Sequence, residues 1–322
     1  MSLSSVVVVK PSSLGDIVHT LPAVHFLKST FSDTKIYWIA NTEWTPLLEG
    51  NADVTTVIPF PRTDFRGAAG ILKFFRWCRC LSGLTPDLVL DFQGLFRSAW
   101  MARSANGKAV YGLSDSREAS RFYYDKRAVV RPDQHSVARC LALAKLAGAN
   151  VSGSVQFPLP PGKPIVTVKL PKPFVALHPF ARGPGKSLMP AEISEFTRSI
   201  DPVPVVIVGR SDAKFESHQN VVSLVNRTDL AELIWVLREA RFIVSVDSGP
   251  MHIAAAVSSE LVSIHTWSDP RLVGPYNPDA WIWKDRRLFQ VRSIDGEKFR
   301  GSTGKRPDLT QIAGFVRNRI LH

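Results

Sequence analysis

The sequence predicts an α/β protein built from two units, each with a parallel sheet covered by helices on both faces. Short runs rich in Val, Ile and Leu alternate with amphipathic stretches, which is the pattern of buried parallel strands separated by helices. The chain has 322 residues, more than one hydrophobic core usually serves. Six prolines crowd residues 158–173, where neither a helix nor a central strand can run. We therefore expect domains at 1–160 and 161–322.

The first unit opens with the β-branched run Val6–Val9, which predicts a buried strand. Turn-forming residues 11–16 follow, and then Ile17, Leu21 and Val24 recur at helical spacing. The rest of the unit is expected to contain strands at 36–40, 54–59 and 88–90 and helices at 70–81 and 136–147.

The same order of elements restarts after the proline-rich segment. A strand at 174–177, a loop at 178–186 and a helix at 191–200 are expected first, and then strands at 203–208, 242–246 and 261–265. A last helix at 308–321 fits against either unit.

The charge balance points to an anionic partner. The 40 Lys and Arg against 28 Asp and Glu give a net charge of +12 and a pI of about 9.8. The excess is shared evenly by the two halves and forms no basic tail, which favours a small polyanionic substrate or an acidic membrane surface over a nucleic acid. Three cysteines without metal-ligand spacing, and no apolar run long enough for a signal peptide or a membrane span, favour the cytoplasm.

The loop Lys10–Asp16 follows the first strand, where open α/β sheets place their ligands. Gly15 allows the backbone to approach a ligand closely. Asp16, at the start of a helix, fits two roles: a general base for an incoming hydroxyl, or a helix cap with no chemistry.

Two further loops fit a diphosphate. In residues 245–252 a strand enters a small-residue turn and a helix, so that Ser248 and Gly249 can offer free backbone N–H groups to an anion. The alternative is an ordinary turn capped by Asp247 or Ser248. The loop 178–186 brings Arg182 and Lys186, which can neutralise phosphates or form a solvated surface loop.

A fourth motif, Asp91–Gly94, follows another apolar strand and precedes a basic and aromatic stretch at 117–139. Arg117 and Arg121 in that stretch suit an acceptor that bears phosphate or carboxylate, and solvated charge is the alternative. The sequence has no Asp-X-Asp and no His-Glu-X-X-His, so we expect no metal and no other cofactor.

Five blocks of the chain occur in the order seen in a known family: residues 10–23 (Lys-Pro-Ser-Ser-Leu-Gly-Asp-Ile-Val-His-Thr-Leu-Pro-Ala), 91–95, 135–139, 244–252 and 268–270. From first to last they span residues 10–270, which is most of the chain. The sequence resembles the bacterial lipopolysaccharide heptosyltransferases of glycosyltransferase family 9. That resemblance implies a GT-B fold, in which two Rossmann-like domains face each other across a cleft. The N-terminal domain then binds the acceptor and the C-terminal domain binds the nucleotide sugar.

The resemblance also implies an inverting, metal-independent transfer of heptose from ADP-heptose to the Kdo of the lipopolysaccharide inner core. Asp16 is the implied catalytic base. The implied donor site consists of Arg182, Lys186, Asp247, Ser248, Gly249 and His252, with Glu216 near the ribose and Asp212 as an equal candidate there. The implied acceptor site consists of Ser13, Gly15, Gln93, Arg117 and Arg121.

The chain departs from the family pattern around Lys186. Residues 183–190 read Gly-Pro-Gly-Lys-Ser-Leu-Met-Pro, without the family's tryptophan between the lysine and the proline and with one extra residue. Transfer of another sugar from another nucleotide therefore stays open, as does a nucleotide- or polyanion-binding module without turnover. The aromatic and basic segment 71–77 fits either a contact with an anionic inner leaflet or a buried helix.

Overall fold

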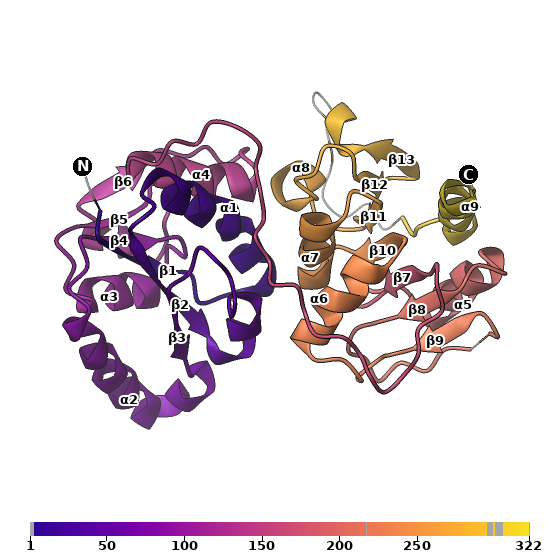
Figure 1. Ribbon diagram of the computed structural model, residues 1–322, viewed down its shortest axis with the longest axis horizontal. Coiled ribbons are helices and arrows are strands. Elements are labelled where there is room, and N and C mark those ends of the chain that lie inside the picture. Colours follow the sequence, from indigo (N-terminus) through magenta and orange to yellow (C-terminus); the bar gives the residue numbers. More distant parts are fainter. Residues whose placement is uncertain (1–2, 217, 295–298, 300–304, 322) are drawn as a thin grey trace. The chain divides into compact units, whose positions relative to one another are not determined.

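A computed structural model describes residues 3–216, 218–294, 299 and 305–321 (Figure 1). The chain forms two compact units, Met1–Pro160 and Pro161–His322. The point of division lies inside the proline-rich segment. Each unit is an α/β layer structure of its own.

The N-terminal unit contains a six-stranded parallel sheet with the order β3-β2-β1-β4-β5-β6. Its strands are β1 (Ser5–Val9), β2 (Lys35–Asn41), β3 (Thr56–Phe60), β4 (Leu88–Asp91), β5 (Val110–Leu113) and β6 (Lys126–Ala128). Its α-helices are α1 (Leu14–Thr30), α2 (Gly67–Cys80), α3 (Phe96–Ser104) and α4 (Ser136–Leu146). Short 3₁₀ helices include η2 (Arg62–Phe65) and η4 (Ser120–Tyr123).

The C-terminal unit contains a seven-stranded sheet with the order β13-β12-β11-β10-β7-β8-β9. Its strands are β7 (Val175–His178), β8 (Val205–Ile207), β9 (Val221–Ser223), β10 (Phe242–Val246), β11 (Leu261–Ile264), β12 (Trp281–Lys284) and β13 (Arg287–Gln290). Its α-helices are α5 (Pro190–Ser199), α6 (Leu230–Glu239), α7 (Gly249–Val257), α8 (Pro270–Val273) and α9 (Leu309–Leu321). All pairs in this sheet are parallel except β12 with β13.

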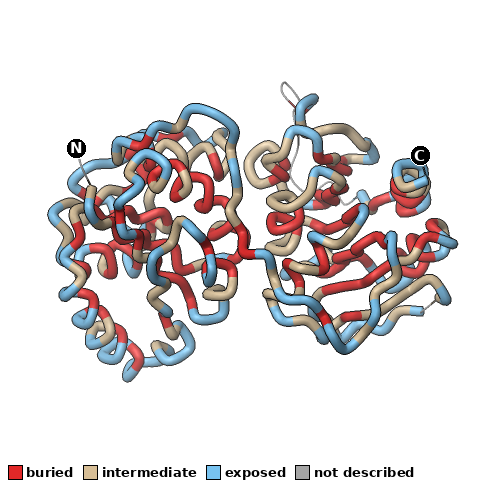
Figure 2. The backbone as a smooth tube through the Cα atoms, in the orientation of Figure 1, coloured by how far each residue is buried: buried red, intermediate tan, exposed pale blue. Residues whose placement is uncertain are grey.

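Apolar burial fixes which strands lie at the centre of each sheet. Val6–Val9 are completely buried between β2 and β4, and β10 is buried along its whole length between β7 and β11 (Figure 2). In a parallel sheet the strand order reverses beside such a central strand, and ligands bind outside the carboxyl ends there. Lys10 follows β1 and Asp247 follows β10, so both lie at these positions.

The structure shows where the last helix packs and how far the segment 71–77 is buried. Helix α9 packs against α5 of the C-terminal unit, where Leu309, Ile312 and Val316 join the buried core. The aromatic side chains of segment 71–77 are not all on the surface, because Phe74 is buried and Phe75 and Trp77 are half-buried. Within the described part of the chain, none of the helices is both long and apolar enough to cross a bilayer.

Candidate active site

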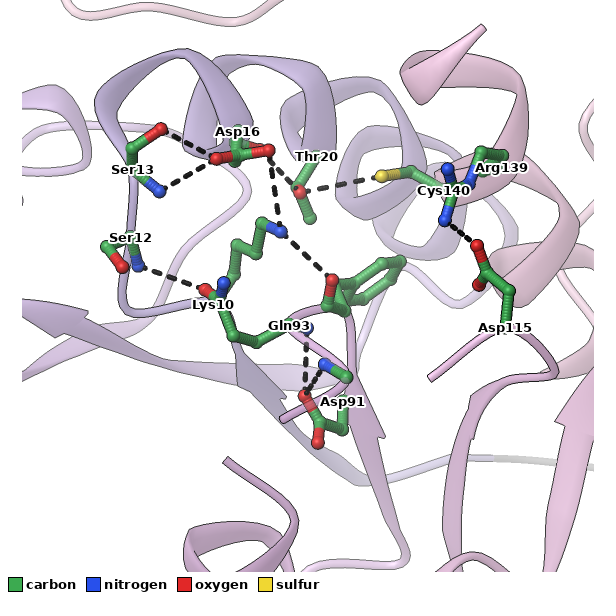
Figure 3. Close-up of polar contacts among 12 residues, drawn as sticks. Lys10, Ser12, Ser13, Asp16, Thr20, Asp91, Gln93, Asp115, Arg139 and Cys140 are labelled. Atoms are coloured by element: carbon green, nitrogen blue, oxygen red, sulfur yellow. Dashed lines mark hydrogen bonds and ion pairs between the residues drawn. The ribbon is translucent and has the colours of Figure 1, made fainter. Parts of the chain in front are cut away.

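The loop after β1 positions a lysine and an aspartate next to each other (Figure 3). Lys10 is buried, and its Nζ donates a hydrogen bond to the carbonyl oxygen of Phe92 at 3.0 Å. The same Nζ lies 3.8 Å from Oδ1 of Asp16. Burying an ammonium group is costly unless it is paired, so the carboxylate and the carbonyl explain why this lysine is tolerated at the sheet end.

The Asp16 carboxylate takes part in the N-terminal cap of α1 and is also exposed to solvent. Ser13 is the N-cap of α1, and its backbone N–H and hydroxyl donate to Oδ2 of Asp16 at 2.9 and 2.6 Å. The expected cap position is thus corrected: Asp16 is the third helical residue and closes the cap from there. Its side chain is still 44% exposed, so the carboxylate can reach a ligand.

A buried carboxylate holds the neighbouring loop in place. Asp91 is fully buried and accepts hydrogen bonds from the hydroxyls of Ser98 (2.8 Å) and Tyr124 (2.7 Å) and from the N–H groups of Gln93 and Gly94. Burial raises the pKa of Asp91, and these four donors act against that rise. Asp91 therefore holds the loop that contains Gln93 and Gly94 through hydrogen bonds from the buried side.

The loops that follow β1 and β4 are joined by a hydrogen bond at the carboxyl end of the sheet. Oε1 of Gln93 accepts a hydrogen bond from the N–H of Ser12 at 3.2 Å. These contacts bring Ser13, Asp16 and Gln93 close together (Figure 3), and Gly15 is buried next to Asp16 in α1.

The two arginines expected to bind the acceptor, Arg117 and Arg121, lie further along the chain and are exposed. The backbone N–H of Arg117 donates to the carbonyl oxygen of Gly94 at 2.8 Å, which ties its segment to the Gln93 loop. The Arg121 guanidinium lies 4.9 Å from the centre of the Phe122 ring. The model therefore links Arg117 to the site through the main chain and places Arg121 on an aromatic face.

In the C-terminal unit, Lys186 and Asp247 form an ion pair. Nζ of Lys186 lies 3.2 Å from Oδ2 of Asp247, and both side chains are partly or largely buried. Burial favours a raised pKa for Asp247, but His265, a hydrogen bond from Ser268 and Lys186 outweigh it and hold the pKa below its ordinary value. The pair links the loop after β7 to the carboxyl end of β10.

The loop that carries Lys186 is braced on several sides. The hydroxyl of Thr266 and the guanidinium of Arg306 both donate to the carbonyl oxygen of Gly185, at 3.0 and 2.9 Å. Arg306 also donates to the carbonyl oxygen of Ser187 and pairs with Glu192 on α5. Sequence reasoning missed Arg306, because its partners lie more than 100 positions away.

Ser248 is the N-cap residue of α7, but its side chain does not cap the helix. Its hydroxyl donates to the carbonyl oxygen of Val246 and lies 3.2 Å from Nδ1 of the buried His178, and it makes no side-chain hydrogen bond to the helix. Burial lowers the pKa of His178 to about 4, so its ring is neutral at pH 7. The hydroxyl is therefore turned toward β7, and the first N–H groups of α7 are not capped by it.

Two more side chains of this unit were not singled out from the sequence. Trp267 is 57% exposed after β11, with Nζ of Lys186 5.8 Å from its ring centre. His265 is fully buried between Ser268 (2.8 Å) and Ser263 (3.1 Å), and burial is the main reason that its pKa falls to about 4. His265 supports Asp247, as noted above, and Trp267 forms an exposed aromatic face beside Lys186.

The other residues expected to bind the nucleotide sugar have fewer contacts with the Lys186–Asp247 pair. His252 is nearly buried on α7 and acts on Asp247 electrostatically, whereas Arg182 is exposed. Asp212 is exposed as well. Glu216 is exposed and pairs with Arg198 of α5 at 3.2 Å, so the model does not bring it to the Lys186–Asp247 pair. Among the described residues, no three His, Cys, Asp or Glu side chains gather in a way that could hold a metal ion.

Two doubly wound units, each with polar loops at the carboxyl ends of its central strands, are the architecture of the GT-B fold. The model of glycosyltransferase family 9 (heptosyltransferase) matches residues 75–191 and 205–288. The chain belongs to this family and is a glycosyltransferase.

Two similar proteins bear the name of heptosyltransferases, in agreement with the family match. Lipopolysaccharide heptosyltransferase 1 of Pseudomonas aeruginosa is 29% identical over 309 residues, covering 84% of this chain and 81% of the relative. The enzyme of the same name from Salmonella typhimurium is 29% identical over 291 residues, covering 84% and 91%.

Solved structures share the fold. Escherichia coli heptosyltransferase WaaC with ADP gives a TM-score of 0.73 at 24% identity, covering 86% of this chain and 92% of that one. The family 9 glycosyltransferase of Veillonella parvula gives 0.78 at 15% identity, covering 99% and 98%. These matches confirm the GT-B fold predicted from the sequence.

Proposed function

We propose that the protein transfers heptose from ADP-heptose to the Kdo region of the lipopolysaccharide inner core, with inversion and without a metal. The relatives named above are lipopolysaccharide heptosyltransferases, and a related structure contains ADP. The observation that carries the proposal is the pair of carboxyl-end sites: an exposed carboxylate beside a buried lysine in one unit, and a lysine beside a helix N-terminus in the other.

The C-terminal site is suited to a nucleoside diphosphate. Lys186 can exchange its contact with Asp247 for the donor phosphates, and the backbone N–H of Gly249, the first residue of α7, offers a further donor; Pro250 has no N–H, and that of Met251 already donates to the carbonyl oxygen of Ser248. Asp247 and its neighbours keep the lysine in place before the donor arrives. Together these groups stabilise the negative charge that develops on ADP as it leaves, which is the task that a metal performs in other transferases.

The N-terminal site is suited to activating a hydroxyl. The exposed carboxylate of Asp16 takes the proton from the acceptor hydroxyl while that oxygen attacks the anomeric carbon of the heptose. The bond from this carbon to the diphosphate oxygen breaks on the opposite face, and its electron pair leaves with ADP. One displacement of this kind inverts the anomeric configuration.

The acceptor is lipid-linked, so the enzyme works at the cytoplasmic face of the inner membrane as a peripheral protein. Arg117 and Arg121 hold the anionic acceptor beside the Gln93 loop, and no nucleic acid takes part. The altered loop 183–190 favours a second candidate, the same transfer with another sugar nucleotide.

A nucleotide panel tests the donor assignment. Thermal stabilisation of the purified protein is measured with ADP, UDP, GDP and CDP, each with magnesium and with EDTA. We expect ADP to raise the melting temperature most, equally under both conditions. A preference for UDP or GDP would overturn the ADP-heptose assignment, a dependence on magnesium would overturn the metal-free assignment, and no shift at all would favour a module without this donor.

A further inference from the structure

Helices α2 and α3 and the 3₁₀ helix η4 form one surface of the N-terminal unit, which we call the α2–α3–η4 face. Four large apolar side chains stand exposed on it: Ile71 (57%), Leu72 (75%), Phe96 (40%) and Phe122 (74%). Among the described residues, the N-terminal unit exposes just one other side chain of this kind to a comparable degree, Val129. Large exposed apolar side chains on three adjoining elements are typical of an interaction site.

A row of aromatic rings joins the three elements beneath these side chains. The ring of Phe75 on α2 meets Trp100 of α3 at 5.0 Å, and Phe96 of α3 meets Tyr123 of η4 at 5.8 Å. Trp100 and Tyr123 lie 6.3 Å apart and close the row. All four rings are partly exposed to solvent, so the row belongs to the surface of the unit and not to its buried core.

The charge of α2 is positive, whereas beside α3 the exposed Glu118 carboxylate accepts a hydrogen bond from the N–H of Phe96 at 3.1 Å. Helix α2 (Gly-Ala-Ala-Gly-Ile-Leu-Lys-Phe-Phe-Arg-Trp-Cys-Arg-Cys) has no acidic residue, and its Lys73, Arg76 and Arg79 are exposed. Leu72, Arg76 and Arg79 share the side of the helix opposite the buried Phe74 and Cys78, because these positions follow the helical repeat. Figure 2 shows exposed and buried residues alternating along this helix.

We propose that the α2–α3–η4 face docks on the surface of a bilayer that contains anionic lipids. Half-exposed aromatic rings, protruding Leu and Phe side chains and flanking arginines match the boundary between acyl chains and negatively charged headgroups. The inference rests on the proposed function, whose acceptor is anchored in a membrane. Arg117 lies in the segment that leads into η4 and is tied to Gly94, so docking here holds the acceptor-binding loop near the membrane.

The first test is flotation with vesicles, without any sugar donor or acceptor. Wild-type protein is expected to float with vesicles of phosphatidylglycerol and phosphatidylethanolamine and to stay behind with pure phosphatidylcholine. Arg76→Gln with Arg79→Gln should weaken the binding roughly 30-fold, since each basic residue at such a surface contributes about 1 kcal/mol. Leu72→Ser should weaken it about 10-fold. Val166→Ser with Lys169→Gln, two exposed positions of the C-terminal unit, is the matched control and should change nothing.

The second test uses the cysteines. Cys80 is exposed on α2, whereas Cys78 and Cys140 are buried and burial raises the pKa of both, so a polarity-sensitive thiol dye attaches at Cys80. Its emission is expected to shift to the blue on anionic vesicles. The same dye on Val166→Cys in a Cys80→Ser background should not respond.

Several results would overturn the inference. They are absence of flotation, variants that bind like the control, or a dye on Cys80 that does not respond while the protein floats. Binding that requires a phosphorylated acceptor in detergent, with none to phosphatidylglycerol vesicles, would mean that the face recognises the saccharide instead. Transfer activity on a detergent-dispersed acceptor should survive in all these variants, so a failure of docking and a failure of the proposed function can be told apart.

Discussion

Asp16 and Lys186 are each held by a neighbour of opposite charge, and each is still accessible. The Asp16 carboxylate accepts the Ser13 hydrogen bonds on one oxygen and faces Lys10 with the other. Lys186 is 27% exposed while it contacts Asp247. Such pairs keep a charged group in position before the substrate binds, which reduces the reorganisation that catalysis requires.

Substitution of Asp16 separates its two roles. Asp16→Asn keeps an oxygen that can accept from Ser13, so the helix cap should be retained, but it removes the charge that faces the buried Lys10, so the melting temperature should fall. Loss of the base should lower turnover at least roughly 100-fold, with ADP binding retained. Steady-state kinetics and calorimetric titration with ADP measure both effects. Turnover close to that of the wild type would remove Asp16 as the base.

The Lys186–Asp247 pair predicts a loss of affinity for the donor. Lys186→Met removes the cation that is to contact the diphosphate, so we expect ADP to bind roughly 10- to 100-fold more weakly, in line with a charged hydrogen bond worth about 1.5–3 kcal/mol. Titration calorimetry checks this. Arg103→Met, which breaks an exposed pair with Asp125 in the N-terminal unit, is the control and should bind ADP normally.

At the scale of elements, the carboxyl ends of β7 and β8 approach each other closely. Gly209 has φ +121°, and a Cβ atom on it would lie 2.9 Å from Cδ2 of Phe180 and 3.0 Å from Nε2 of His178. Only glycine combines that backbone conformation with that space. The close approach sets the position of His178, which in turn contacts Ser248 at the start of α7.

Gly209→Ala is therefore expected to lower the free energy of unfolding by about 1–3 kcal/mol and to weaken ADP binding. Chemical denaturation and nucleotide titration measure the two effects. Gly50→Ala, where φ is +78° and a Cβ would meet nothing within 4 Å, should cost about 1 kcal/mol and leave ADP binding unchanged. Equal effects of the two substitutions would contradict the close-packing account.

The buried histidines predict how stability depends on pH. The pKa of His178 and of His265 is about 4 in the folded chain and ordinarily 6.5, so between these values only the unfolded chain takes up the protons. The contribution of the two neutral histidines to the free energy of unfolding is complete above pH 6.5 and is lost as the pH falls from 6.5 toward 4. The melting temperature should drop across this window, and His178→Asn should make the drop shallower. A curve of unchanged slope in that variant would be evidence against a neutral, buried His178.

At the scale of the whole molecule, hydrophobic pattern and proline placement were enough to predict two parallel-sheet units. The runs at Val6–Val9 and Phe242–Val246 are continuous because those strands are buried on both faces. Helix α3 and the short strands β5, β6 and β9 were not predicted, since they are short or weakly periodic. Helix α6 was missed although the sequence contains its signals, a capping box of Asp229 with Glu232 and apolar residues at helical spacing. The antiparallel β13 was also missed, because an edge strand follows from a tight reversal after β12 and not from a distinct apolar run.

The candidate site was predictable as far as local motifs reach. Lys186 and Ser248 lie in loops that follow strands, and Asp16 lies in the first turn of the helix after β1, so their positions at the sheet ends could be inferred from the order of the elements alone. Lys10, His178, Trp267 and Arg306 were not assigned roles, because each acts through partners that only the folded chain brings near. Their contacts depend on strand order and on burial, which a local pattern does not contain.

The measurement that tests the central claim most directly is a transfer assay with purified protein, ADP-heptose and a Kdo-terminated lipid acceptor in EDTA. The proposal predicts an acceptor heavier by one heptose, with the anomeric configuration of the donor inverted, and no such product from Asp16→Asn. Absence of transfer from ADP-heptose, together with transfer from another sugar nucleotide under the same conditions, would contradict the heptose assignment.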